Sequence, residues 1–338
     1  MDRDKLERLR ARYAGVAGDQ IYDERFRRVA EMQFRGGVRT KPYSGQSTFL
    51  DAPSQMTAEG LDVALVGVPM DLGVTNRPGA RFGPRAVRDV ERIGPYNHAL
   101  DILPSGILKL ADVGDVPFRS RYSLEQSIED IEVFYKDLLK TGAMPLSVGG
   151  DHSISHPILK VLGEHEPVGM VHIDAHADTS GEFEGEKFHH GGPFRNAVLE
   201  GVLDPDRCIQ IGIRGSAEYL WEFSYESGMT VIHAEEFDEI GVSAVIAKAR
   251  AVVGEKPYYI TIDVDGIDPA FAPGTGTPEV GGLTPREVQR LLRGLDGKQV
   301  VGGDVVEIAP QYDANSNTAM VGAQMLFEIL SLVAASRQ

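Results

Sequence analysis

VGMVHIDAHAD, residues 168–178, joins an unbroken apolar run to a group of carboxylate and imidazole side chains. A strand that is apolar on both faces, instead of alternating, is typical of a parallel sheet covered by helices on both sides. Ligands of such sheets bind beyond the carboxyl ends of the strands. The stretch therefore predicts both a buried parallel strand and a functional site where that strand ends.

Further short apolar runs along the chain end in the same way. They are LDVALVG (61–67), LKLAD (108–112), MPLSVGG (144–150), CIQIGI (208–213), MTVIH (229–233), YYITIDVD (258–265) and QVVGGDVVEI (299–308). Helix-like stretches lie between them, for example at 123–142, 243–254 and 284–295. This alternation predicts an α/β protein: a three-layer α/β/α domain with a single, mostly parallel, eight-stranded sheet.

The first sixty residues have a different character. Residues 2–14 and 22–33 are charged and helix-like, and 34–60 are rich in Gly, Pro, Ser and Thr. We interpret residues 1–60 as an N-terminal arm that wraps over the core or over a neighbouring subunit, and 61–338 as one catalytic domain. Composition alone supports a loosely ordered tail equally well.

Composition narrows the class of protein. The 338 residues include 34 basic and 50 acidic ones, a net charge of −16, which disfavours binding to nucleic acid or to anionic membranes. The single cysteine, Cys208, cannot form an internal disulfide and suits a reducing compartment. Apolar runs stay short of the roughly 18 residues that span a bilayer, and the charged N-terminus lacks a signal-peptide pattern. We expect a cytoplasmic enzyme.

Acidic and imidazole side chains gather at the predicted strand ends. In HIDAHAD they recur at steps of two, so an extended chain points them the same way, and the aspartates of DVD (263–265) repeat this spacing. The predicted metal ligands are His152, Asp174, His176, Asp178, Asp263 and Asp265. His172 lies deeper in its strand, and we assign it to the core or to supporting a ligand.

Two divalent cations would balance the charge of this group. Four carboxylates carry −4, and without cations they would raise one another's pKa. Carboxylates with imidazole favour Mn²⁺, with Ni²⁺ or Co²⁺ possible, whereas Zn²⁺ prefers thiolates and Mg²⁺ fewer imidazoles. Two metals about 3.5–4 Å apart can share a water, lower its pKa and direct it at an electrophilic carbon. A lone DxD pair is more often a cap, but six candidates at three strand ends favour a metal centre.

The motifs resemble those of the ureohydrolases, the family of arginase, agmatinase and their guanidino-acid relatives. GGDHS (149–153), DAHAD (174–178) and DVDGIDPAFAPGTGTP (263–278) match its signature blocks in order, from about Leu61 to the C-terminus. NRPGARFGPRAVR (76–88) is closer to the agmatinase-like branch, and the arm and WEFSYESGMTVIHAEE (221–236) resemble the guanidine and metformin hydrolases. The resemblance implies an arginase-like fold and hydrolysis of a small guanidino compound to urea, or a substituted urea, plus an amine.

The resemblance also implies individual roles. Asp174 and Asp263 would bridge two metals, with His152 and Asp178 completing one site and His176 and Asp265 the other; Asp178 would also orient the bridging hydroxide.

Outside the metal ligands, His190 in HHGGPF (189–194) would pass a proton to the leaving amine, and Glu307 in DVVEIAP (304–310) would pair with the guanidinium. Otherwise His190 would be an exposed loop histidine and Glu307 a strand-end ion pair. His189 is interpreted as a structural or surface residue.

The substrate is less closely defined. Gly192 stands where agmatinase-like enzymes usually have Thr, which changes the shape of the substrate pocket. The loop 180–188 carries three glutamates and so disfavours a substrate carboxylate, although Lys187 or Arg39 could pair with one. Agmatine, guanidine or an N-alkylated biguanide such as metformin fits better.

Other functions remain open at this point. The chain could be a non-catalytic or partner-dependent subunit of a hetero-oligomer with a homologous subunit, or a mononuclear zinc deacetylase on a related fold. A dehydrogenase is excluded because no G-x-G-x-x-G joins a strand to a helix. By resemblance we expect a homo-oligomer, a trimer or hexamer.

Overall fold

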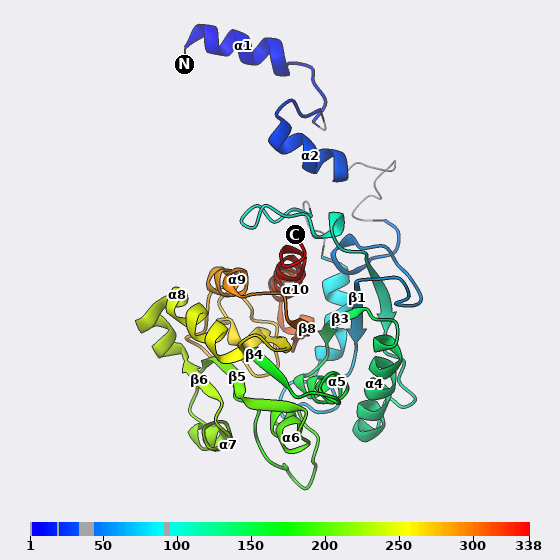
Figure 1. The fold of residues 1–338 in the computed structure, drawn as a ribbon, viewed down its shortest axis with the longest axis vertical. Helices are drawn as coiled ribbons and strands as arrows, with labels where there is room; N and C mark the ends of the chain where they lie inside the picture. Colours follow the sequence, from blue (N-terminus) through cyan, green and yellow to red (C-terminus); the bar gives the residue numbers. More distant parts are fainter. Residues whose placement is uncertain (1, 19, 34–43, 91–94) are drawn as a thin grey trace.

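The computed structural model describes residues 2–18, 20–33, 44–90 and 95–338, and in them the chain forms one sheet (Figure 1). The eight strands lie in the order β2-β1-β3-β8-β7-β4-β5-β6, and every neighbouring pair is parallel. Their bounds are β1 Val63–Val68, β2 Leu110–Asp115, β3 Met144–Gly149, β4 Val168–Ile173, β5 Leu203–Ile213, β6 Thr230–His233, β7 Tyr258–Asp263 and β8 Val300–Val306. The predicted α/β fold is confirmed, and all eight predicted runs are strands.

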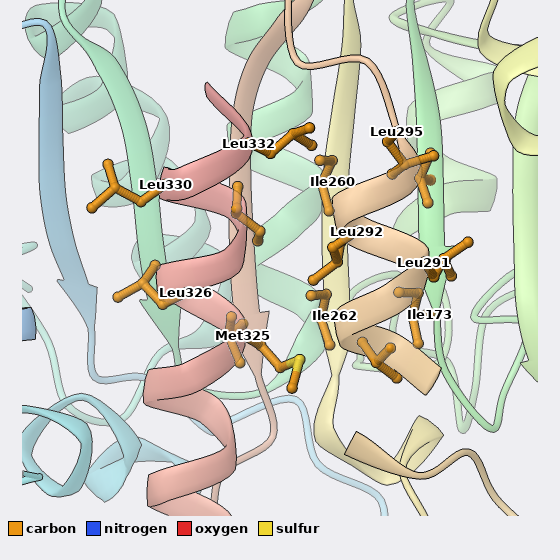
Figure 2. Close-up of a cluster of buried hydrophobic side chains, with 14 of the residues drawn as sticks. Ile173, Ile260, Ile262, Leu291, Leu292, Leu295, Met325, Leu326, Leu330 and Leu332 are labelled. Atoms are coloured by element: carbon orange, nitrogen blue, oxygen red, sulfur yellow. The ribbon is translucent and has the colours of Figure 1, made fainter. Parts of the chain in front are cut away.

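Helices cover both faces of the sheet and enclose two separate hydrophobic cores. On one face lie α3 (Gly83–Arg88), α8 (Ala234–Val253), α9 (Pro285–Gly294) and α10 (Asn317–Ala335). Figure 2 shows side chains of α9 and α10 against Ile173, Ile260 and Ile262 of the central strands. On the other face lie α4 (Leu124–Leu139), α5 (Ser155–Leu162) and α6 (Pro193–Leu199), and α7 (Glu222–Ser227) packs near the β6 edge.

Helix α10 is long and apolar enough to cross a membrane by length and composition, but most of its surface is buried in the protein. Its one acidic residue, Glu328, is fully buried and accepts bonds from Arg293 Nε at 2.8 Å and from Asn97 Nδ2 at 2.9 Å. A paired, buried carboxylate of this kind is expected in the core of a globular domain. We therefore describe α10 as a core helix.

The predicted arm contains two different parts. Helices α1 (Arg3–Tyr13) and α2 (Glu24–Gln33) lie away from the sheet, and α1 has no buried residue (Figure 1). By contrast, Phe49 is fully buried; its backbone N–H donates to Asp112 at 3.0 Å, and the guanidinium of Arg88 covers its ring at 4.0 Å. The chain near Phe49 therefore packs on the domain, whereas Arg39 lies outside the described residues.

The order of the strands places the site. β3, β8, β7 and β4 are consecutive in the sheet although they are far apart in the chain. His152 follows β3, Asp174 follows β4, Asp263 ends β7 and Glu307 follows β8. Because parallel strands end at the same edge, these four side chains meet at one edge of the sheet.

Candidate metal centre and active site

The six predicted ligands come together at this edge. His152 begins a short 3₁₀ turn after β3, and Asp263 caps a second turn that holds Asp265, its Oδ1 accepting the Asp265 N–H at 2.8 Å. All six are buried except His176, whose side chain is 31% exposed. Asp178 has a positive φ of 51°, a strained conformation for a non-glycine residue that is typical of functional sites.

His152 faces three carboxylates. Its Nδ1 lies 2.9 Å from Asp178 Oδ2, 3.1 Å from Asp174 Oδ2 and 3.4 Å from Asp263 Oδ2. This buried nitrogen nevertheless makes no hydrogen bond of acceptable geometry with any described residue. A nitrogen lone pair and three carboxylate oxygens that converge without bonding one another are arranged as cation ligands are.

A second group adjoins the first. His176 Nδ1 lies 3.1 Å from Asp265 Oδ2 and 3.6 Å from Asp174 Oδ1. Asp174 thus uses one oxygen toward each group, as a bridging ligand would. His172 is fully buried, with Nε2 2.7 Å from Asp174 Oδ2. Its place beside Asp174 agrees with the predicted supporting role, and its nitrogen is also close enough to His152 and Asp174 to belong to a ligand group.

The electrostatics of the site call for cations. Burial, together with the charges of Asp265 and Asp174, raises the pKa of Asp263 well above its usual range. Burial likewise raises the pKa of Asp265 to about 6, although His176 opposes the shift. Asp174 is also buried, yet the pKa of its carboxyl is held well below the usual range by His172 and His152. Carboxylates crowded in this way are relieved when divalent cations bind among them.

The donor set fits two divalent metal ions. It consists of carboxylate oxygens and imidazole nitrogens, and Cys208 is buried within β5 instead of joining it. Hard oxygen donors with one imidazole in each group suit Mn²⁺-type ions better than a thiolate-bound Zn²⁺. His152 is held from behind, because its Nε2 lies 2.8 Å from Thr261 Oγ1, which in turn donates to Asp304 at 2.5 Å. Support of this kind fixes the orientation of a ligand imidazole.

His190 and Glu307 form a pair beside the metal groups. His190 Nδ1 lies 2.8 Å from Glu307 Oε1, which also accepts the His152 backbone N–H at 3.0 Å. Glu307 Oε2 is buried and has no hydrogen-bond partner among the described residues. A methyl group added at Gly276 would come within 3.7 Å of Oε2 and 2.8 Å of Arg77 O. The free oxygen is therefore next to a glycine that leaves the space open.

His190 is buried, unlike an exposed loop histidine. Burial lowers its pKa, but the charge of Glu307 outweighs this and raises the pKa to about 9. Its other nitrogen, Nε2, lies 2.7 Å from Thr75 Oγ1 and 3.1 Å from the Thr75 backbone nitrogen. Thr75 lies directly before the NRPGAR segment, and nothing in the sequence indicated its contact with His190.

Two further residues that sequence reasoning missed support the site. Arg214 is buried and donates to backbone carbonyls, including those of Asp265 at 2.6 Å and Glu279 at 2.7 Å, so it holds the Asp265 turn. Asp151 accepts from Gly73 N at 2.8 Å and fixes the start of the segment that carries Thr75. Asp151 belongs to the GGDHS motif and was identifiable there. Arg214 carries no sequence signal beyond its place after β5.

The residues of loop 180–188 and of the segment that follows it have definite surroundings. Lys187 Nζ pairs with Glu200 at 2.9 Å. Glu182, Glu184 and Glu186 are exposed. His189 is buried, with Nε2 2.8 Å from Gly181 O, which agrees with a structural role and excludes a surface one. Gly192 lies beside His189, where an added Cβ would be 3.1 Å from the imidazole Nε2.

Comparison with known proteins gives consistent matches. The Arginase family model matches residues 61–331. A guanidinopropionase of Pseudomonas aeruginosa is 48% identical over 87% of this chain and 93% of its own, and a mitochondrial agmatinase of Gallus gallus is 47% identical over 86% of each. The solved proclavaminate amidino hydrolase of Streptomyces clavuligerus superimposes with a TM-score of 0.84 at 37% identity, covering 88% of this chain and all of that one.

Proposed function

The chain belongs to the arginase family, and from that premise we propose that it cleaves the C–N bond of a small guanidino compound, releasing urea or a substituted urea and an amine. The observation that carries this proposal is the buried Oε2 of Glu307, which has no partner in the described part of the chain and lies beside His190 and the two groups of metal ligands. A planar guanidinium is matched by a carboxylate that still has an acceptor to offer.

Each group of this chain has a part in the reaction. Glu307 Oε2 accepts N–H bonds from the guanidinium and balances its charge. When bound, two divalent cations would lower the pKa of water and so supply the nucleophile. The water oxygen bonds to the guanidino carbon as one of its protons passes to Asp178. The bond from that carbon to the tail nitrogen then breaks, His190 Nε2 gives a proton to the departing amine, and the remaining water proton is released as the urea C=O forms, which returns His190 to its protonated state. The Glu307 contact at Nδ1 keeps the imidazole oriented for this transfer.

Asp178 is proposed to accept a hydrogen bond from the attacking water and to orient it. Its Oδ2 lies in the first ligand group, 2.9 Å from His152 Nδ1. Asp178→Asn keeps the size of the side chain but changes its charge and its acceptors, so we expect turnover to be lost while the folded state persists. Circular dichroism checks the fold, and Asp137→Asn on the surface of α4 is the matched control. Retained turnover in Asp178→Asn would contradict the role.

For the substrate we propose a guanidine with a cationic or uncharged tail: agmatine, guanidine itself or an N-alkylated biguanide such as metformin. Support comes from the exposed glutamates of loop 180–188 and from the pairing of Lys187 with Glu200. Several similar relatives are named for guanidino acids, so 3-guanidinopropionate and 4-guanidinobutyrate belong in the same assay. Faster turnover of the acids than of agmatine, guanidine and metformin would reverse this assignment.

We propose Mn²⁺ as the resident metal, with Ni²⁺ as the alternative, because the donors are oxygen and nitrogen only. Metal analysis after loading with each ion tests this proposal, and one Zn²⁺ per chain would favour the deacetylase alternative.

We also propose a cytoplasmic homo-oligomer, a trimer or hexamer, with residues 1–60 as an arm and no nucleic-acid or membrane partner. The exposed apolar side chains of Leu9 and Tyr13 in α1 support a role of the arm in assembly. Light scattering with and without residues 2–33 tests that role.

A non-catalytic or partner-dependent subunit is the second candidate function. All six predicted ligands are present together with His190 and Glu307, which disfavours it. Two bound metals with no turnover of any guanidine by the homo-oligomer would favour it.

A further inference from the structure

Loop 180–188 joins Asp178 to His190 and so borders the site, and the two segments at its ends are bonded to each other. Ser180 N–H donates to Gly191 O at 2.8 Å, and the His189 imidazole lies with Nε2 2.8 Å from Gly181 O. Because a carbonyl only accepts, His189 Nε2 carries the proton and donates it. The root of the loop 180–188 is therefore held by one backbone bond and one side-chain bond from the HHGG segment.

The side chain that makes this second bond is enclosed. Only 7% of the His189 surface is exposed, and its ring lies 6.1 Å from that of Phe183, between centroids. Phe183 and Glu186 pair in an isolated antiparallel β-bridge at which the loop reverses direction, and the glutamates of the loop are exposed. His189 is thus the buried anchor of a loop whose remaining side chains are largely exposed.

Gly192 fits this anchor by having no side chain. A Cβ placed there would lie 3.1 Å from His189 Nε2 and 3.1 Å from Ser180 O, closer than ordinary van der Waals contact. A branched side chain would need still more room. The imidazole of His189 and the carbonyl of Ser180 together restrict the space for a side chain at position 192, so His189 and Gly192 fit each other.

The same segment is bonded to the catalytic groups. The His190 backbone N–H donates to Gly73 O at 2.9 Å, and the Phe194 N–H donates to Asp178 O at 3.2 Å. Loop 180–188 begins two residues after Asp178. Residues 189–194 are therefore fixed relative to the site, and the hydrogen bond from His189 to Gly181 O fixes the start of the loop relative to them.

We propose that His189, paired with Gly192, is a positioning residue that holds loop 180–188 against the site entrance and thereby determines which tails of guanidino substrates are admitted. The inference rests on the proposed function and deepens it. His189 itself does not touch the reacting atoms, because its neighbour His190 makes the contact with Glu307. Removing the His189 hydrogen bond should therefore change the position of the loop more than the rate of the chemical step.

The first test measures substrate preference in the metal-loaded full-length protein. We compare wild type, His189→Ala, which removes the donor, and His189→Gln, which keeps one, on guanidine, agmatine, metformin and 4-guanidinobutyrate. We expect His189→Ala to change the ratios of kcat/KM among these substrates at least about fivefold, the scale of one lost hydrogen bond, mainly through KM. His189→Gln should restore much of the wild-type ratio, and exposed His165→Ala should match wild type. An equal fall for every substrate, or no change, would overturn the proposal.

The second test does not depend on activity. A glutamate-specific protease needs a stretch of extended backbone around Glu182, Glu184 or Glu186, so it cuts faster when the loop detaches, and the rate follows the population of the open state. We expect cleavage of this loop to be about tenfold faster in His189→Ala and slow again in His189→Gln. Unchanged cleavage would overturn the proposal that His189 holds the loop, even if no substrate were turned over. Conversely, if the wild type were inactive but showed this cleavage pattern, the proposed function would be refuted and the role of His189 in holding the loop would be supported.

A double substitution tests the fit between His189 and Gly192. Gly192→Thr alone should displace His189 and speed loop cleavage. In the His189→Ala background the imidazole is already absent, so Gly192→Thr should speed cleavage much less. We expect the two effects to be clearly less than additive. Additive effects would show that Gly192 and His189 act separately and would contradict the pairing.

Discussion

Glu307 is the residue on which the proposed chemistry depends most directly. One of its oxygens is occupied by His190 and the His152 N–H, and the other is buried and free among the described residues. Its φ of +63° is strained for a non-glycine residue, as is common at functional sites. We expect Glu307→Gln to lower kcat/KM by about a hundredfold or more, because an amide cannot balance a guanidinium. Steady-state kinetics on the best substrate measures this, with exposed Glu255→Gln as control, and a change below about threefold would contradict guanidinium binding there.

Thr75 provides a second prediction at this scale. Its hydroxyl can donate to neutral His190 Nε2 or accept from the protonated ring, so it can remain bonded in both states. We expect Thr75→Val to lower kcat about tenfold and to shift the alkaline limb of the pH–rate profile, and Thr75→Ser to behave like wild type. If Thr75→Val and Thr75→Ser had the same kinetics, the Thr75 hydroxyl would have no role in the reaction.

At the scale of elements, α9 and α10 are joined through the buried Glu328. Arg293 of α9 and Asn97 both donate to this carboxylate. Removing it leaves the mostly buried Arg293 cation without its partner, so we expect Glu328→Ala to lower the free energy of unfolding by about 3 kcal/mol. Thr284→Ala, which removes the capping box of α9, should cost about 1 kcal/mol. Urea denaturation of the metal-loaded protein ranks the two, and a smaller loss for Glu328→Ala than for Thr284→Ala would contradict this account of the core.

The elements also show what the sequence could predict. Strands with continuous apolar runs were found within a few residues, and the α9 cap at Thr284 was identified from its motif. The prediction for β5 began at residue 208, five residues after its true start at Leu203, because DPDR (204–207) is polar and continues the strand beyond the apolar core. The contacts of Thr75 with His190, 115 residues apart, depend on how strands are ordered in the sheet. Local patterns do not encode that order, and the same holds for the buried setting of His189 and the backbone bonds of Arg214.

For the whole molecule, the acidic centre predicts a pH-dependent effect of metal. Without metal, the raised pKa of Asp265, about 6 in the folded protein, adds stability below its unfolded value that is lost as the pH rises through about 6. Asp263 shifts in the same direction. Cations bind the deprotonated ligands and remove this penalty. We expect the rise in Tm on adding Mn²⁺ to be larger at pH 7.5 than at pH 5, as measured by calorimetry. A larger rise at pH 5 would contradict the assigned charges.

The central claim is the hydrolysis of a guanidino C–N bond. The most direct measurement is product analysis after the protein, loaded separately with Mn²⁺ and Ni²⁺, is incubated with agmatine, arginine, guanidine, metformin and the two guanidino acids. We predict urea, or a substituted urea, together with the matching amine from at least one of them, and about a hundredfold less or lower still from Glu307→Gln under the same conditions. No urea from any substrate with either metal, although two ions are bound per chain, would contradict the claim.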